Sequence, residues 1–193
     1  MHLVSEELER ALLRNDPAAF GQLFDLYADQ LLRLGYAMLG SAADAEDVVQ
    51  DTLIRFMDSL RAGRYRPGNG TLKAYLKRSV RNRCIDRLRT GGELHLSLQE
   101  EIAASDGPTG QLADLPWRML DEERLREAIE HAIQKLPAAQ RAVIVLRVME
   151  EHSYAEIAED LGISINYVKN LLGRARKRLR QELGPIISKG RSP

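Results

Sequence analysis

The chain of 193 residues is 44% hydrophobic and 29% charged, a composition typical of a globular protein with one medium domain or two small ones. Its 28 Lys and Arg balance 28 Asp and Glu, which would argue against a nucleic-acid binder if the charge were evenly spread. However, the basic residues are concentrated in 73–89 and 169–180, and the acids before residue 60 and in 93–123. Local cationic patches of this kind are sufficient for an encounter with DNA.

A single cysteine, Cys84, excludes an internal disulfide. It is either a half-buried structural residue or a redox sensor activated by its neighbours Arg83 and Arg87. The N-terminus lacks the basic start and apolar core of a signal peptide, and no run approaches the roughly 18 apolar residues of a membrane span. We therefore expect a soluble, cytoplasmic protein that does not insert into membranes.

Helical periodicity begins near the N-terminus. We predict a short amphipathic helix over 6–15, with Leu8, Leu12 and Leu13 on one side. Asp16 and Pro17 are the residue types that begin a helix, as its N-cap and its first position. A long helix should follow and end at Gly40 and Ser41, with an apolar stripe formed by Phe20, Leu23, Phe24, Tyr27, Leu31, Leu34 and Met38.

The next predicted helix, from Ala42 to Leu60, has an acidic side. Its core side consists of Val49, Leu53, Phe56 and Leu60, while Asp44, Asp47 and Asp51 recur at steps of three and four on another side. Carboxylates at this spacing could hold a metal, but no histidine is near and Gln50 and Arg55 lie among them. A solvated or partner-facing acidic surface is favoured, and we expect no metal and no cofactor.

Residues 61–71 form the first predicted loop, because three glycines, Pro67 and Asn69 interrupt any regular element. The loop also contains Arg64, Tyr65 and Arg66. A helix with a basic exposed side should follow, burying Leu72, Leu76, Val80, Ile85 and Leu88 and exposing Lys73, Lys77, Arg78, Arg81 and Arg89. A basic loop with an aromatic residue beside such a helix is typical of a surface that follows an unpaired nucleic-acid strand, and the alternative is a plain solvated surface.

Glycines, prolines and acids dominate 91–116 and predict a linker of low order. We place one domain at 1–90, the acidic flexible linker at 91–120, a second domain at 121–184 and a disordered tail at 185–193. Trp117, Met119 and Leu120 should pack onto the second domain.

The second domain should begin with a helix over 122–135, burying Leu125, Ile129 and either Ile133 or Ala132. Leu136 and Pro137 mark a break. A helix over 138–150 should then bury Val143, Ile144, Leu146 and Val148.

A helix-turn-helix is predicted from 153 onwards. Ser153 and Glu156 have capping-box spacing, Gly162 can end the first helix in a left-handed conformation, and Ser164 can cap a second helix. Val168, Leu172, Ala175 and Leu179 form one buried stripe of that second helix.

No acid interrupts Ser164 to Arg180, so the exposed face of the second helix is basic. Such a face suits the major groove of DNA, whereas a solvated surface helix normally mixes acids with bases. No alternating strand pattern occurs anywhere in the sequence. We therefore predict an all-α fold of two small helical domains.

Three motifs carry a family resemblance. D-A-E-D-V-V-Q-D-T-L-I-R-F, L-P-A-A-Q-R-A-V-I-V-L-R and S-Y-A-E-I-A-E-D-L-G-I-S, in this order and at this separation, make the chain resemble an extracytoplasmic-function (ECF) sigma factor of the sigma-70 family. The first resembles the part of region 2 that docks on the coiled coil of the RNA polymerase β′ subunit. This implies a polymerase-binding surface with Asp47, Gln50 and Asp51, and with Val48 or Leu53 as an apolar contact.

The resemblance also implies that the loop and the following helix bind the minus-ten promoter element. The family extrudes a base there, which costs a few kcal/mol and must be offset by pocket hydrogen bonds and backbone cations. Asn82 stands where the family has a base-contacting Asn, and Tyr75 where it usually has Trp. The implied contacts are Arg64, Tyr65, Arg66, Asn69, Lys73, Lys77, Arg78, Arg81 and Asn82.

The helix-turn-helix resembles region 4, which reads the minus-thirty-five element. Relatives commonly have Arg at the position of Leu171; an Arg paired with guanine contributes about 1–3 kcal/mol of discrimination that Leu cannot supply. Either a different upstream element is read or Lys169 and Asn170 take over. The implied contacts are Ser164, Asn166, Tyr167, Lys169, Asn170, Arg174 and Lys177.

The function implied is a specificity subunit that binds core RNA polymerase through its β′ and β subunits, recognises and opens promoter DNA, and catalyses no reaction itself. An anti-sigma factor is an expected further partner. One alternative is a sigma-mimicking decoy that binds regulators without promoter recognition, which the two basic patches disfavour. A nucleic-acid enzyme is disfavoured too, because no nucleophile or carboxylate cluster lies beside a supporting base.

Overall fold

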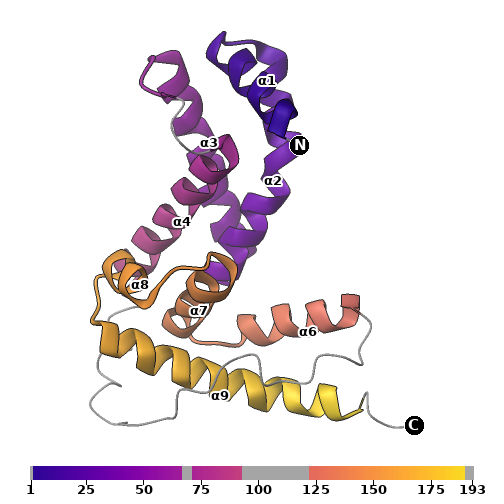
Figure 1. Ribbon diagram of the computed structural model, residues 1–193, viewed down its shortest axis with the longest axis vertical. Coiled ribbons are helices and arrows are strands. Elements are labelled where there is room, and N and C mark those ends of the chain that lie inside the picture. Colours follow the sequence, from indigo (N-terminus) through magenta and orange to yellow (C-terminus); the bar gives the residue numbers. More distant parts are fainter. Residues whose placement is uncertain (1, 67–70, 93–121, 190–193) are drawn as a thin grey trace. The chain divides into compact units, whose positions relative to one another are not determined.

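The computed structural model describes residues 2–66, 71–92 and 122–189 (Figure 1). The chain divides into two compact units, Met1–Asp86 and Arg87–Pro193. Every regular element in the described ranges is a helix, which confirms the all-α prediction. Residues 93–120 of the predicted linker, with Trp117, Met119 and Leu120, lie outside them. None of the described helices is long and apolar enough to cross a bilayer.

Helices α1 (His2–Leu13) and α2 (Pro17–Leu39) begin the first unit. The Asp16 carboxylate accepts a hydrogen bond from the Ala18 N–H at 3.0 Å, and Pro17 is the first residue of α2, as predicted. Gly40, with φ 73°, ends the helix. Within the predicted stripes, Leu13 and Phe24 are exposed rather than buried, Phe24 at 56%. The apolar stripe is therefore wider than the core that it covers.

Helix α3 (Ala42–Arg61) packs along α2 and buries Val49, Leu53, Phe56 and Leu60, which confirms the predicted core side. The two helices approach closely at Gly35, where an added Cβ would lie 3.1 Å from the Cβ of Ala45. A side chain at position 35 would force the helices apart. The close approach therefore depends on glycine.

Helix α4 (Leu72–Thr90) buries Leu72, Leu76, Val80, Ile85 and Leu88, again as predicted. Arg83 of α4 forms an ion pair with Asp51 of α3. Cys84 is fully buried rather than half-buried. Because its thiol has no access to solvent, the structure favours the structural reading over the redox sensor.

The second unit contains α6 (Glu122–Gln134), α7 (Ala138–Ile144), a π-helical turn (Val145–Met149, η3), α8 (Tyr154–Leu161) and α9 (Ile165–Lys189). The predicted helix over 138–150 is thus α7 followed by the π-turn. Val148, expected in the core, is 49% exposed. Val148 lies within the π-turn, where the wider helical spacing places side chains at different angles than in an α-helix, and this explains the error.

Helix α9 contacts α6, α7 and α8 (Figure 1). Leu179 and Leu183 continue its buried stripe, and the helix runs to Lys189 with Pro185 inside it. We predicted a disordered tail from residue 185, so this prediction is wrong for 185–189. Packing of the stripe offsets the backbone hydrogen bond that Pro185 cannot donate.

Candidate nucleic-acid and partner interfaces

The turn between α8 and α9 has the geometry that its residues predict. Ser153 and Glu156 form a complete capping box, and Gly162 adopts a left-handed conformation with φ 66°. The Ser164 Oγ accepts a hydrogen bond from the Tyr167 N–H at 3.1 Å and so caps α9. The first turns of α9 are thereby held at a fixed angle to α8, as a helix-turn-helix requires.

The exposed face of α9 is polar and cationic. Four of its predicted contact residues are exposed and Arg174 is partly exposed; the exposed ones are Asn166, Lys169, Asn170 and Lys177. A row of amides followed by cations can donate to base edges first and to phosphates further along the helix.

Tyr167 and Leu171 lie on the opposite side of α9, and each is 1% exposed. The prediction that Tyr167 is a contact residue therefore does not fit the structure. Tyr167, Val168, Leu171 and Leu172 together hold the helix on the rest of the unit. An Arg at position 171 would have to leave the core to reach DNA.

On α4, the predicted contact residues Lys73, Arg78 and Asn82 are exposed, and Lys77 and Arg81 are partly exposed. In the preceding loop Arg64 and Arg66 are exposed, while Asn69 lies outside the described residues. Arg78 and Asn82 are four residues apart and so share one face of the helix.

Tyr65, predicted to contact DNA, is instead a core residue with 6% exposure. Its ring lies edge-on to Phe56 at 5.0 Å, and its hydroxyl donates to the carboxylate of Glu9 in α1. Burial, together with Glu9, raises the pKa of the Tyr65 phenol well above its usual range, so the hydroxyl stays protonated. The loop is therefore anchored to α1 and α3 through this side chain.

Tyr75 is an aromatic residue on α4 that the predicted contacts did not include. Its ring contacts Tyr65 at 5.1 Å and Phe56 at 5.6 Å, yet it is 41% exposed. Tyr75, Arg78 and Asn82 are spaced by three and four residues, so they share one face of α4. Its spacing from the predicted contact residues Arg78 and Asn82 was the signal in the sequence that could have identified Tyr75 as a further contact residue.

The acidic side of α3 presents exposed polar groups and a carboxylate, Asp51, that pairs with two arginines. Asp47 and Gln50 are exposed. The Asp51 carboxylate accepts from Arg55 at 3.1 Å and pairs with Arg83 of α4. Val48 is buried, so the prediction that it contacts a partner does not fit the structure.

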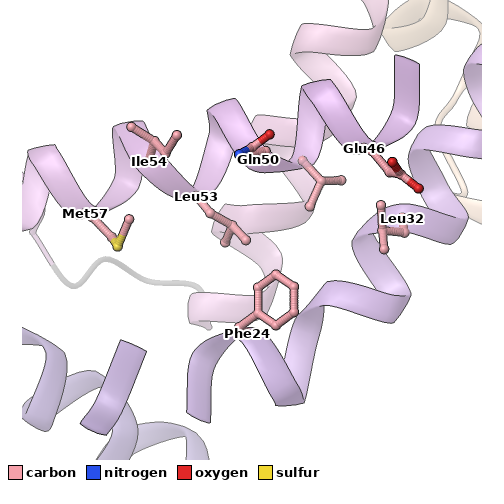
Figure 2. Close-up of a pocket in the computed structure, with 8 residues that line it drawn as sticks. Phe24, Leu32, Glu46, Gln50, Leu53, Ile54 and Met57 are labelled. Atoms are coloured by element: carbon pink, nitrogen blue, oxygen red, sulfur yellow. The ribbon is translucent and has the colours of Figure 1, made fainter. Parts of the chain in front are cut away.

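Beside this acidic side, α2 and α3 enclose an apolar groove of about 520 Å³ (Figure 2). Leu53 is mostly buried but forms part of its wall, next to the exposed Phe24 and Ile54. Glu46 and Gln50 add polar groups. The full lining is Phe24, Leu32, Glu46, Val49, Gln50, Leu53, Ile54 and Met57. Among the described residues, no group of three or more potential metal ligands is found.

Comparisons with known proteins agree with this arrangement. The family model Sigma-70 region 2 matches residues 23–93, and Sigma-70, region 4 matches residues 126–179. The ECF RNA polymerase sigma factor SigW of Bacillus subtilis is 32% identical over 191 residues, which cover 95% of this chain and 98% of SigW. The chain belongs to the ECF sigma factors.

A second relative of this sigma factor, the ECF RNA polymerase sigma factor SigM of Mycobacterium tuberculosis, is 33% identical over 181 residues, covering 92% of this chain and 84% of SigM. Among solved structures, the sigma factor RpoE of Bartonella quintana in complex with the anti-sigma factor NepR has 26% identity and a TM-score of 0.49, covering 86% of this chain and 96% of that one.

An ECF sigma factor binds core RNA polymerase and promoter DNA and directs transcription initiation, without being an enzyme. The region 2 match contains α3 and α4, and the region 4 match contains α8 and the first turns of α9. The predicted contact residues therefore lie in the two matched regions.

Proposed function

We propose that this sigma factor divides its work among three surfaces. The α2–α3 groove binds core polymerase, the exposed face of α4 with its preceding loop binds the minus-ten element, and α9 reads the minus-thirty-five element. The observation that carries the proposal is the separation of charge: the exposed face of α9 has no acid as far as Arg180, whereas α3 presents carboxylates. Each sign of charge suits a different partner.

For the upstream element, Asn166, Lys169 and Asn170 are the proposed readers. They are exposed in the first turns of α9, which is the part of a recognition helix that contacts base edges. Arg174 and Lys177 follow on the same helix and are proposed to contact phosphates. Ser164 acts as the helix cap, while Tyr167 and Leu171 support the helix from the core.

For the minus-ten element, Asn82 and Arg78 are proposed to contact an extruded base, with Tyr75 beside them as a stacking surface. Stacking on an aromatic ring contributes about 1–3 kcal/mol per base, which helps to offset the cost of unstacking. The remaining cations would contact the strand's phosphates; they are Arg64, Arg66, Lys73, Lys77 and Arg81. Tyr65 acts indirectly, as the anchor of the loop.

For core polymerase, the proposed contact is an amphipathic helix of the β′ subunit whose apolar side enters the groove and whose cations meet the acids on its edge. Phe24 and Ile54 are large apolar side chains exposed at the groove, and Glu46 and Asp47 are exposed carboxylates on the same helix as Ile54. An exposed apolar patch edged by polar groups is typical of a protein-binding site. Leu53 lines the wall, and the engaged Asp51 mainly orders α3 and α4.

We also propose that the protein works in the cytoplasm, where core polymerase and the chromosome are, and that an anti-sigma factor holds it inactive by covering the groove and the basic face of α4. A partner that covered both surfaces would block polymerase binding and promoter opening together.

The test is run-off transcription by core polymerase on a library of randomised promoters, with and without the protein. Protein-dependent initiation at a shared two-part motif is the expected result. Binding to core polymerase without initiation would favour the sigma-mimicking decoy.

Two single variants separate the surfaces. Asn82→Ala should impair promoter opening, measured by reactivity of unpaired bases, while its affinity for core polymerase is unchanged. Ile54→Ala should weaken core binding, and at saturating concentration of the variant, opening should recover. Equal loss of both activities in both variants would contradict the division of labour.

A further inference from the structure

Gly173 lies in the interior of α9, where glycine is an unfavourable choice. An interior helical glycine is less stable than alanine because of its greater backbone freedom in the unfolded chain. Gly173 does not have a left-handed φ that would explain it, and an added Cβ would meet nothing within 4 Å. Neither the fold of the helix nor its packing against the residues that the structure describes requires a glycine at this position.

At two other positions the structure of the chain itself explains why the residue is glycine. At Gly35 an added Cβ would lie 3.1 Å from Ala45, and Gly162 has a φ of 66° that few other residues adopt. Gly173 has neither feature. The described part of the chain therefore gives no reason for the missing side chain at position 173, and we look for one in a binding partner.

The neighbours of Gly173 on the helix surface indicate what lies outside. Residues three, four and seven positions away share its face. Arg176 among them is partly exposed, and the others are exposed: Asn166, Lys169, Asn170, Lys177 and Arg180. Gly173 thus occupies the middle of the amide and cation face proposed to meet the upstream element. A side chain there would stand between the helix backbone and the DNA.

We infer that Gly173 is the point where upstream promoter DNA approaches the backbone of α9 most closely, and that the missing side chain lets Lys169 and Asn170 reach the DNA. Glycine serves this purpose wherever a ligand must come close to a backbone. The inference rests on the proposed function of α9 as the reading helix.

The test compares Gly173→Ala with Gly21→Ala in the full chain. Gly21 is an exposed helical glycine and Gly173 a partly exposed one, and neither has an atom within 4 Å of an added Cβ, so Gly21 serves as the control. Both variants should unfold a few degrees higher than the parent, the shift expected for replacing such a glycine in a small domain. Holoenzyme made with Gly173→Ala should bind its selected promoter about tenfold more weakly, the loss caused by a methyl group forced into a packed contact. Gly173→Gln should lose more, and Gly21→Ala should bind normally.

A stabilised Gly173→Ala protein with unchanged promoter affinity would overturn the inference, as would an equal loss in Gly21→Ala. Lys169→Ala, measured in parallel, tests the underlying function. If Lys169→Ala weakens binding and Gly173→Ala does not, the inference alone fails. If neither weakens binding, α9 is not the reading helix and both fail. Promoters without the upstream element should show no difference between Gly173→Ala and the parent.

Discussion

Removing one oxygen atom from Tyr65 tests whether this residue anchors the loop before α4 or contacts DNA. Tyr65→Phe keeps the ring and its edge-on contacts with Phe56 and Tyr75, but it removes the hydroxyl that donates to Glu9. Hydrogen bonds to charged groups contribute about 1.5–3 kcal/mol. Because Glu9 is only partly buried, we expect the free energy of unfolding to fall by about 1–2 kcal/mol.

The assay is urea unfolding of the full chain followed by circular dichroism. For a unit of this size, each kcal/mol also lowers the thermal midpoint by about 4–8 °C. Tyr75→Phe is the matched control, and it should change stability by less than about 0.5 kcal/mol because its ring is partly exposed. Glu9→Gln and the double variant complete a cycle whose coupling energy measures the bond itself.

The pH dependence adds an independent check. The raised phenol pKa means that the folded chain holds its proton more tightly than the unfolded chain, whose tyrosine titrates near its usual value of about 10. The contribution of Tyr65 is therefore complete below about pH 10 and is lost as the pH rises above it, so part of the alkaline destabilisation should be missing in Tyr65→Phe. Unchanged stability with impaired promoter opening would refute the anchoring role and restore Tyr65 as a DNA contact.

Three further outcomes follow from described contacts. Arg83→Met should lower the free energy of unfolding by about 1 kcal/mol, because it removes the ion pair with Asp51. In a double-mutant cycle, the charge exchange Asp51→Arg with Arg83→Asp should recover part of the stability that the two single variants lose; if their losses simply add, the ion pair contributes nothing. Ser153→Ala should cost about 1 kcal/mol in urea unfolding by removing the capping box of α8, and Ser153→Thr should recover most of that. The Cys84 thiol should react with a thiol reagent at the rate of unfolding; fast labelling of the native chain would reopen the redox role.

Structural features that depend only on residues close together in the sequence could be predicted from the sequence. Asp16, Ser153 and Gly162 act at helix ends through contacts within a few positions, so residue type and spacing predict them. The buried stripes of α3 and α4 follow from helical periodicity, which measures the same local geometry. Capping residues and helical periodicity can both be recognised within one short segment, without knowing which segments contact each other.

Features that depend on distant contacts could not be predicted in this way. The hydroxyl of Tyr65 reaches a carboxylate 56 positions earlier, and Asp51 pairs with an arginine 32 positions later. Tyr65 stands in a loop without periodicity, so the sequence could not distinguish a buried ring from an exposed one. Phe24 is the opposite case: its place in an apolar stripe predicted burial, but its side chain is exposed and lines the groove. A stripe shows which side of a helix is apolar, and not how much of it other helices cover.

The neutral net charge has a consequence for how the two basic faces can work. Each face offers only a few cations, and the acids elsewhere in the chain cancel them at long range, so a single face should bind DNA weakly at physiological salt. Two weak sites on one chain bind tightly together only when their spacing matches that of the two promoter elements. If core polymerase holds both units of the sigma factor at that spacing, the entropic cost of arranging them is not paid again when promoter DNA binds. We therefore expect the holoenzyme to bind the selected promoter far more tightly than the free chain does, as measured by filter binding. A free chain that bound this promoter as tightly as the holoenzyme would contradict this expectation, because the spacing would then already be present in the chain alone.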